Sequence, residues 1–98
     1  MRIEFADLKL QRLATDPRYT HGLGAPVVKA FRKAVGYLDR CTDERDIRAI
    51  RGYHFKQLER ERAHQWSMRL NDQFRLILEF NRDDVGKVIV LVEVGDYH

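Results

Sequence analysis

The sequence predicts an α+β fold, an antiparallel-rich twisted sheet of four to five strands with two to three helices packed on one face. Two patterns support this prediction. Apolar residues recur at helical spacing up to about residue 50, whereas alternating or continuous apolar runs fill the rest of the chain. Helices that precede strands, without regular alternation of the two, are typical of the α+β class. The length of 98 residues fits one domain that spans residues 1–98.

The composition indicates a globular, cytoplasmic protein with no membrane partner. Hydrophobic residues make up 44% of the chain and aromatic residues 10%, which is too apolar for a disordered chain. No run approaches the roughly 18 consecutive apolar residues of a membrane span, and the N-terminus lacks the apolar stretch of a secretion signal. The net charge of +3 makes anionic partners plausible. The single cysteine, Cys41, is expected to be a small buried hydrophobe.

A short strand and two helices are expected first along the chain. Residues 2–5 predict the strand and residues 6–14 a short helix. A loop with Asp-Pro and Gly-Leu-Gly follows at residues 15–25, after which Pro26 suits the first turn of a helix. The apolar positions of that second helix recur at helical spacing and are Val27, Phe31, Ala34, Val35, Leu38 and Cys41.

A third, shorter helix is expected directly afterwards. Thr42 is predicted to cap it, because the acidic residues that follow suit the positive end of a helix. Ile47 and Ile50 would supply its inward face, and the Gly52 position ends it.

Four strands are predicted in the remaining chain. Residues 54–58 predict a weak strand, and residues 65–70 and 74–80 alternate between apolar and polar side chains. Residues 88–94 form a continuous β-branched run that suits a central strand.

The hairpin between the two alternating strands has a predictable register. A two-residue turn would mix charged and apolar side chains on one face, whereas a three-residue loop at residues 71–73 keeps one face apolar. The second register also places Arg69 opposite Arg75, where like charges repel unless an anion lies between them. A phosphate site is one explanation, and the other is that the guanidinium groups are solvated or paired with Glu79 and Asp72. The apolar pairs of this register are Leu70 with Phe74, Met68 with Leu76, and Trp66 with Leu78.

Candidate catalytic groups follow the last strand directly. Asp96, Tyr97 and His98 are attached to a core strand, which can hold them in a fixed geometry, and we expect them to face the arginine pair. His98 lies close to the Asp96 carboxylate, which favours the protonated imidazole. His54 opens a strand and is either a cleft residue or a structural histidine.

The sequence predicts no metal ion and no nucleotide cofactor. It lacks HExxH, Cys-x-x-Cys and EF-hand patterns, and its Gly-Leu-Gly segment lacks the strand-before, helix-after context of a phosphate loop. Basic residues, histidines and aromatic side chains remain. That combination suits RNA, whose 2′-hydroxyl is an internal nucleophile.

Residues 63–77, together with the terminal Asp-Tyr-His, resemble the HigB toxins of bacterial type II toxin–antitoxin systems, which belong to the RelE/ParE superfamily. The resemblance implies a RelE/ParE-like fold and a ribosome-dependent mRNA interferase that cleaves messages in the A site of the 70S ribosome without metal. It also implies a HigA-like helix-turn-helix antitoxin as partner. The implied catalytic residues are His54, Asp96, Tyr97 and His98; Arg69 and Arg75 would hold the scissile phosphate, and Lys56 and Arg62 would contact RNA or ribosome backbone.

The chain also departs from the family pattern. It has Leu58-Glu59-Arg60 where relatives often have Leu-Lys-Gly, and Phe74 in place of the usual tryptophan. The alternative function is a ParE-like gyrase poison, or a catalytically degenerate module that binds antitoxin and nucleic acid. The terminal Asp-Tyr-His favours the nuclease.

Overall fold

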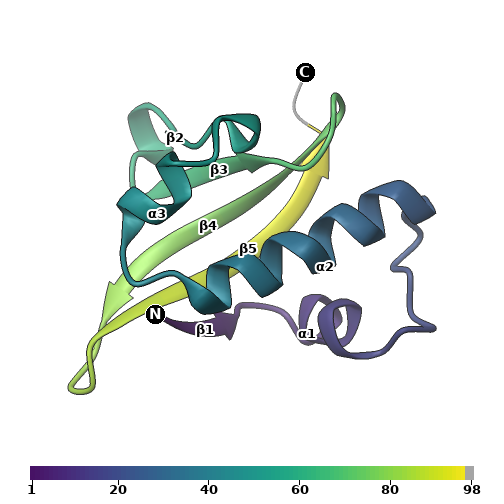
Figure 1. Ribbon diagram of the computed structural model, residues 1–98, viewed down its shortest axis with the longest axis horizontal. Coiled ribbons are helices and arrows are strands. Elements are labelled where there is room, and N and C mark those ends of the chain that lie inside the picture. The colour runs from purple at the N-terminus through teal and green to yellow at the C-terminus, as the bar shows by residue number, and fades with distance from the viewer. Residues whose placement is uncertain (97–98) are drawn as a thin grey trace.

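A five-stranded sheet in the order β1-β5-β4-β3-β2 forms the centre of the structure, a computed structural model that describes residues 1–96. β1 runs parallel to β5, and every other neighbouring pair is antiparallel. Figure 1 shows the strong twist of the long β4–β5 pair. The α+β, antiparallel-rich prediction is therefore confirmed. The strands are β1 (Arg2–Phe5), β2 (Lys56–Gln57), β3 (Gln65–Arg69), β4 (Phe74–Arg82) and β5 (Lys87–Asp96).

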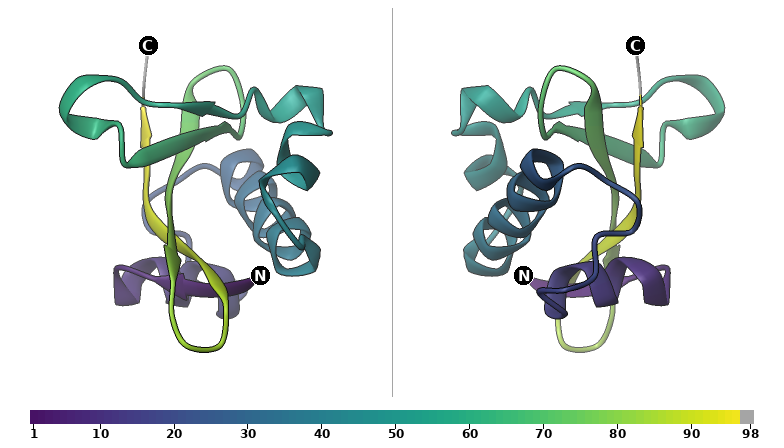
Figure 2. Two further views of the ribbon diagram at one scale, coloured as in Figure 1. Left: turned by 90° about the vertical axis from the view of Figure 1, so that its left-hand side faces the viewer. Right: turned by 90° about the vertical axis from the view of Figure 1, so that its right-hand side faces the viewer.

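Three α-helices cover one face of this sheet (Figures 1 and 2). α1 begins after Asp7, whose carboxylate accepts a hydrogen bond from the Lys9 backbone N–H. α2 has a proline in its first turn, as expected, where the missing N–H costs no helical hydrogen bond. The helices are α1 (Leu8–Thr15), α2 (Ala25–Arg40) and α3 (Glu44–Arg48), and two 3₁₀ turns follow, η1 (Arg51–Tyr53) and η2 (Arg60–Arg62).

The N-cap of α3 is Asp43 and not Thr42, so that prediction is wrong by one residue. The Asp43 side chain accepts a hydrogen bond from the Arg45 backbone N–H, and Asp46 completes a capping box. The Asp46 carboxylate also accepts hydrogen bonds from the backbone N–H (2.8 Å) and hydroxyl (2.9 Å) of Thr42. Thr42 thus binds an acid inside the helix, while the aspartate that follows it caps the free N–H groups.

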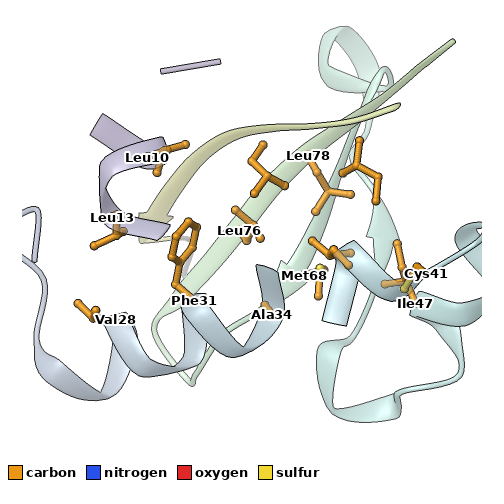
Figure 3. Close-up of a cluster of buried hydrophobic side chains, with 13 residues drawn as sticks. Leu10, Leu13, Val28, Phe31, Ala34, Cys41, Ile47, Met68, Leu76 and Leu78 are labelled. Atoms are coloured by element: carbon orange, nitrogen blue, oxygen red, sulfur yellow. The ribbon is translucent and has the colours of Figure 1, made fainter. Parts of the chain in front are cut away.

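The hydrophobic core lies between the helices and the sheet (Figure 3). Phe31 of α2 points toward β4, where Leu76 and Leu78 are completely buried. Cys41 is buried in the same cluster, as predicted, and burial raises the pKa of its thiol. The members of the cluster are Leu10, Leu13, Val28, Phe31, Ala34, Leu38, Cys41, Ile47, Met68, Leu76, Leu78, Ile89 and Leu91.

The β3–β4 hairpin has the predicted register. Met68 lies opposite Leu76, and Trp66 lies opposite Leu78. The three-residue loop is closed by Asn71, whose side-chain oxygen accepts hydrogen bonds from the backbone N–H groups of Gln73 (2.9 Å) and Phe74 (2.7 Å). One face of the hairpin is therefore apolar and packs on the helices, and the other face is left for polar side chains.

Candidate functional site

The face of the sheet that the helices leave uncovered carries a cationic cavity. Because side chains alternate along a strand, Ser67 and Arg69 of β3 point away from the helices, as do Arg75 and Ile77 of β4. Lys56 of β2 lies opposite Ser67 and shares this face. The cavity has a volume of about 240 Å³ and is lined by Lys56, Leu58, Ser67, Arg75 and Ile77.

Arg75 is the most informative residue of this cavity, because it is half-buried and its hydrogen-bond acceptors are neutral. Its Nε donates to the Ser67 hydroxyl (3.4 Å), and one terminal nitrogen donates to the His54 carbonyl (3.3 Å). Within residues 1–96, no carboxylate forms an ion pair with Arg75. Burial lowers the pKa of Arg75, and the positive charge of Arg69 lowers it further. An anion bound here would offset both effects.

Arg69 lies directly opposite Arg75, as the register predicted. Its guanidinium turns toward the hairpin loop, where Nε donates to the Asn71 carbonyl (3.2 Å) and a terminal nitrogen pairs with Asp72. The alternative explanation, in which the arginines pair with Asp72 and Glu79, is therefore correct for Arg69 and Asp72. This carboxylate is 94% exposed, so the pair contributes little free energy and leaves Arg69 able to bind another anion.

Glu79, the other acid that was expected to pair with the arginines, has different partners. Its carboxylate accepts a hydrogen bond from the Gln65 amide (2.9 Å) and lies 3.8 Å from His64. Glu79 is thus part of a polar row along the outer face, and the arginine pair keeps its net positive charge.

Ser67 belongs to the site, although the sequence patterns did not identify it as a site residue. It is 1% exposed, lies beneath the cavity, and accepts the hydrogen bond from Arg75. The signal was a small hydroxyl residue at an outward position of an alternating strand, two residues before Arg69. A buried hydroxyl at such a position needs a polar partner, which is a reason to look for a site.

Lys56 and Arg62, the two predicted RNA contacts, occupy different places. Lys56 is an exposed wall of the cavity. Arg62 lies beyond it in η2, where its guanidinium donates to the Gln65 side chain (2.8 Å) and pairs with Glu93 (3.0 Å). The structure therefore brings Lys56 to Arg75, while Arg62 belongs to the neighbouring polar row.

His54 lies at the rim of the cavity, where its carbonyl accepts the hydrogen bond from Arg75. Its side chain is exposed and its backbone is left-handed, with φ 44° and ψ 48°. This conformation costs an L-residue roughly 1–2 kcal/mol. The turn after η1 thus holds a strained histidine beside the arginine pair, a place where strain often serves function.

Asp96 lies at the end of β5, on the other face of the sheet from Arg75. The register pairs Arg75 with Gly95 and Phe74 with Asp96, so the Asp96 side chain shares a face with Phe74. Its carboxylate accepts a hydrogen bond from the Gln73 amide (2.9 Å). Our expectation that this side chain faces the arginines is wrong. Tyr97 and His98 lie outside the described residues.

Residues 1–96 lack two features that would point to other kinds of function. No three histidine, cysteine, aspartate or glutamate side chains lie close enough to hold a metal ion together. No helix in this part of the chain has the length and apolar character needed to cross a membrane.

The arrangement of the helices and the mixed sheet is shared by solved structures of RelE-type toxins. A YoeB/ParE toxin from Agrobacterium tumefaciens matches with a TM-score of 0.57 and 12% identity, covering 100% of both chains. A chain of the YoeB-YefM complex from Staphylococcus aureus matches with a TM-score of 0.57 and 20% identity, covering 100% of this chain and 97% of the other. A chain of the toxin-antitoxin complex RelBE2 from Mycobacterium tuberculosis matches with a TM-score of 0.50 and 21% identity, covering 98% and 96%.

The family follows from the sequence match. Residues 3–98 match the family described as the RelE-like toxin of type II toxin-antitoxin system HigB, and the chain belongs to this HigB-like toxin family. No curated protein matches the chain. The family identified from residues 63–77 and the terminal Asp-Tyr-His is thereby confirmed, and the protein is a toxin of a type II toxin–antitoxin system.

Proposed function

We propose that this toxin is a ribosome-dependent mRNA interferase that cleaves mRNA in the ribosomal A site without a metal ion. The observation that carries the proposal is the half-buried Arg75, which faces Arg69 and hydrogen-bonds only to neutral acceptors in the described chain. Two guanidinium groups so placed suit a phosphodiester that gains charge in its transition state. Membership of the HigB-like family supports the same conclusion.

The reaction needs only proton transfers and charge stabilisation. The 2′-oxygen attacks the adjacent phosphorus while a base takes the 2′-hydroxyl proton. The phosphorane then loses the 5′-oxygen, which receives a proton from an acid, and the products are a 2′,3′-cyclic phosphate and a 5′-hydroxyl. We assign the acid and base roles to His54 and His98, with Asp96 tuning the terminal cluster and Tyr97 stacking on or orienting the target nucleotide.

The remaining predicted residues would bind RNA rather than take part in proton transfer. Arg69 and Arg75 hold the scissile phosphate, and Lys56, on the cavity wall, neutralises the same phosphate or the next one. Arg62 contacts RNA or ribosomal backbone from η2, outside the cavity. The face without helices is thus the RNA-binding face in this proposal.

The proposed cellular setting follows from the toxin family. The chain would act as a single domain in the cytoplasm, on mRNA in the 70S ribosome. A HigA-like helix-turn-helix antitoxin, encoded beside it, would block the toxin and repress their operon. A neighbouring reading frame of that kind would support this partner.

Arg75 provides the first test. Arg75→Ala should lower the rate of ribosome-dependent mRNA cleavage by about 10- to 100-fold, because hydrogen bonds to charged groups contribute about 1.5–3 kcal/mol. Arg75→Lys keeps the charge without the fork of donors and should recover only part of the loss. Cleavage is measured by mapping mRNA 5′ ends on programmed ribosomes, with exposed Arg18→Ala as the matched control.

The catalytic assignment has its own test in the same assay. His98→Ala should abolish cleavage while RNA binding persists. Unchanged codon-phased cleavage in this variant would remove His98 from the mechanism. Inhibition of gyrase supercoiling by the wild-type protein, with translation untouched, would overturn the interferase proposal itself.

A further inference from the structure

A second cavity of about 400 Å³ lies between α2, η1 and the end of β3. Its size falls within the range of small-molecule sites, roughly 300–1,000 Å³. Ala30 of α2 and Leu70 at the end of β3 contribute apolar walls. Ile50, whose surface is 40% exposed, lies at the same opening. Of the residues that line it, Arg69 alone has a role in the proposed reaction.

Two tyrosines form its aromatic wall. The rings of Tyr37 and Tyr53 lie 5.8 Å apart at 51°. The Tyr37 hydroxyl donates a hydrogen bond to the Asp46 carbonyl (2.6 Å), which fixes that ring. The Tyr53 hydroxyl makes no hydrogen bond with the described residues, so one donor is left for a ligand. A held aromatic surface with a free polar group suits a planar heterocycle.

Positive charge surrounds the same opening. Lys33 and Arg69 line the cavity, and none of its lining side chains is acidic. Burial raises the pKa values of Tyr37 and Tyr53; the charge of Arg40 opposes this rise at both tyrosines, and the charge of Asp46 adds to it at Tyr37. The cavity therefore favours a ligand that joins an apolar planar group to an anion.

Arg69 connects this cavity with the arginine pair. It lies opposite Arg75 on the RNA-binding face and also lines the second cavity. Arg69 is therefore the residue that a phosphate on the RNA-binding face and a ligand in the second cavity would share.

We propose that this second cavity binds the base of a ribonucleotide adjacent to the phosphate held by Arg69, and so contributes to the base preference of the toxin. The inference rests on the proposed function for its substrate class. Stacking is tolerant of base identity, whereas the Tyr53 hydroxyl and the edges of the cavity supply discrimination.

Binding is tested without any cleavage, by titrating the purified protein with the four ribonucleoside 5′-monophosphates and following its tyrosine ring NMR signals. Inorganic phosphate and the uncharged nucleosides are separate titrations. At least one monophosphate should bind about 5- to 100-fold tighter than inorganic phosphate, because stacking of its base on an aromatic ring increases the affinity by about that factor. Equal affinity for phosphate and all four monophosphates would overturn the proposal.

Variants locate the base. Ala30→Trp fills the cavity and should abolish the advantage of the monophosphate over phosphate, whereas Ala25→Trp, the same change at an exposed position of the same helix, should not. Tyr53→Phe keeps the stacking surface and should retain most of the affinity that Tyr53→Ala loses. This pair tests the site even if Ala30→Trp does not fold, which circular dichroism reports.

Cleavage mapping separates failure of this inference from failure of the proposed function. If the wild type cleaves mRNA and Ala30→Trp cuts at the same positions with the same base preference, the cavity inference is wrong and the nuclease stands. If the wild type does not cleave, the proposed function is wrong, and the nucleotide titrations still decide the cavity. If Ala30→Trp binds nucleotides normally but escapes neutralisation by the antitoxin encoded beside the gene, the cavity is a protein-docking site and the inference is overturned.

Discussion

Replacing Ser67 with alanine removes one hydroxyl from the floor of the cationic cavity and leaves the backbone of β3 intact. That hydroxyl accepts a hydrogen bond from the Nε of Arg75 at 3.4 Å, in a place where Ser67 is 1% exposed and water cannot easily replace it. In the proposed reaction Ser67 would therefore be a positioning residue, which acts on the phosphate through the orientation of Arg75.

The size of the effect follows from this geometry. A hydrogen bond to a charged group contributes about 1.5–3 kcal/mol, and a length of 3.4 Å places this one at the weak end. We expect a loss of about 1–2 kcal/mol, or about 5- to 30-fold in kcat/KM for ribosome-dependent cleavage. Ser67→Cys keeps the size with a weaker acceptor and should fall between Ser67→Ala and the wild type. Thr20→Ala, which removes a hydroxyl from an exposed loop, should have no effect.

A double-mutant cycle distinguishes positioning from a general structural effect. If Ser67 acts through Arg75, Ser67→Ala should add little to the loss already caused by Arg75→Ala, and urea unfolding should show a stable single variant. Full activity of Ser67→Ala beside a severe loss in Arg75→Ala would refute the reasoning. So would independent losses that simply multiply in the double variant.

Two further predictions concern stability. Phe31→Ala should lower the free energy of unfolding by about 3–5 kcal/mol in urea titrations, because Phe31 is completely buried, while exposed Lys29→Ala should change it by less than about 0.5 kcal/mol; equal effects would mean that the core is placed wrongly. Hydrogen bonds from Thr42 lower the pKa of Asp46 below its ordinary 3.8, so its contribution is present above that pH and is lost as the pH falls through the folded-state value. Asp46→Asn should therefore lower the free energy of unfolding at neutral pH and make it fall less steeply as the pH is lowered. If the free energies of unfolding of variant and wild type fall in parallel with pH, this prediction is contradicted.

The hairpin shows why much of the fold was predictable. A strand that slips by one residue moves every side chain to the other face, so the apolar set of residues 65–70 and 74–80 permits only one register. Arg69 and Arg75 were placed opposite each other by that argument, and the structure agrees. The choice required only the period of a strand and the length of its loop.

The position of Asp96 shows where such reasoning ends. The pairing of β4 with β5 contains an irregularity between Ile77 and Leu78, and this changes which residues lie opposite each other farther along. As a result Gly95 lies opposite Arg75, where an unbroken ladder would place Val94, and Asp96 falls on the other face of the sheet from Arg75. The run of residues 88–94 gives no sign of a bulge in its pairing, so the sequence could not assign the face of the residues that follow it.

The parallel pairing of β1 with β5 could not be predicted from the sequence either. Arg2–Phe5 pairs with residues more than eighty positions away, and nothing local chooses that edge over the other. Ser67 is a different case, because alternation fixed its face but not its burial. Burial depends on Leu58 and Lys56, which come from β2 and the segment after it.

The two faces of the sheet explain why Arg75 has no carboxylate partner among residues 1–96. Its strand is anchored from the helix side by Leu76, which is completely buried, so the register that holds Arg75 does not depend on an ion pair of its own. On the outer face Ile77 and Leu58 line the same cavity as the half-buried Arg75, and Ser67 and His54 supply neutral acceptors. In such surroundings a phosphate that binds meets a stronger field than it would in water, and no carboxylate of residues 1–96 has to be displaced from Arg75. An acid added at this face, for example by Ile77→Asp, should therefore weaken RNA binding more than the removal of one RNA contact would. The new carboxylate would pair with Arg75 and compete with the RNA phosphate.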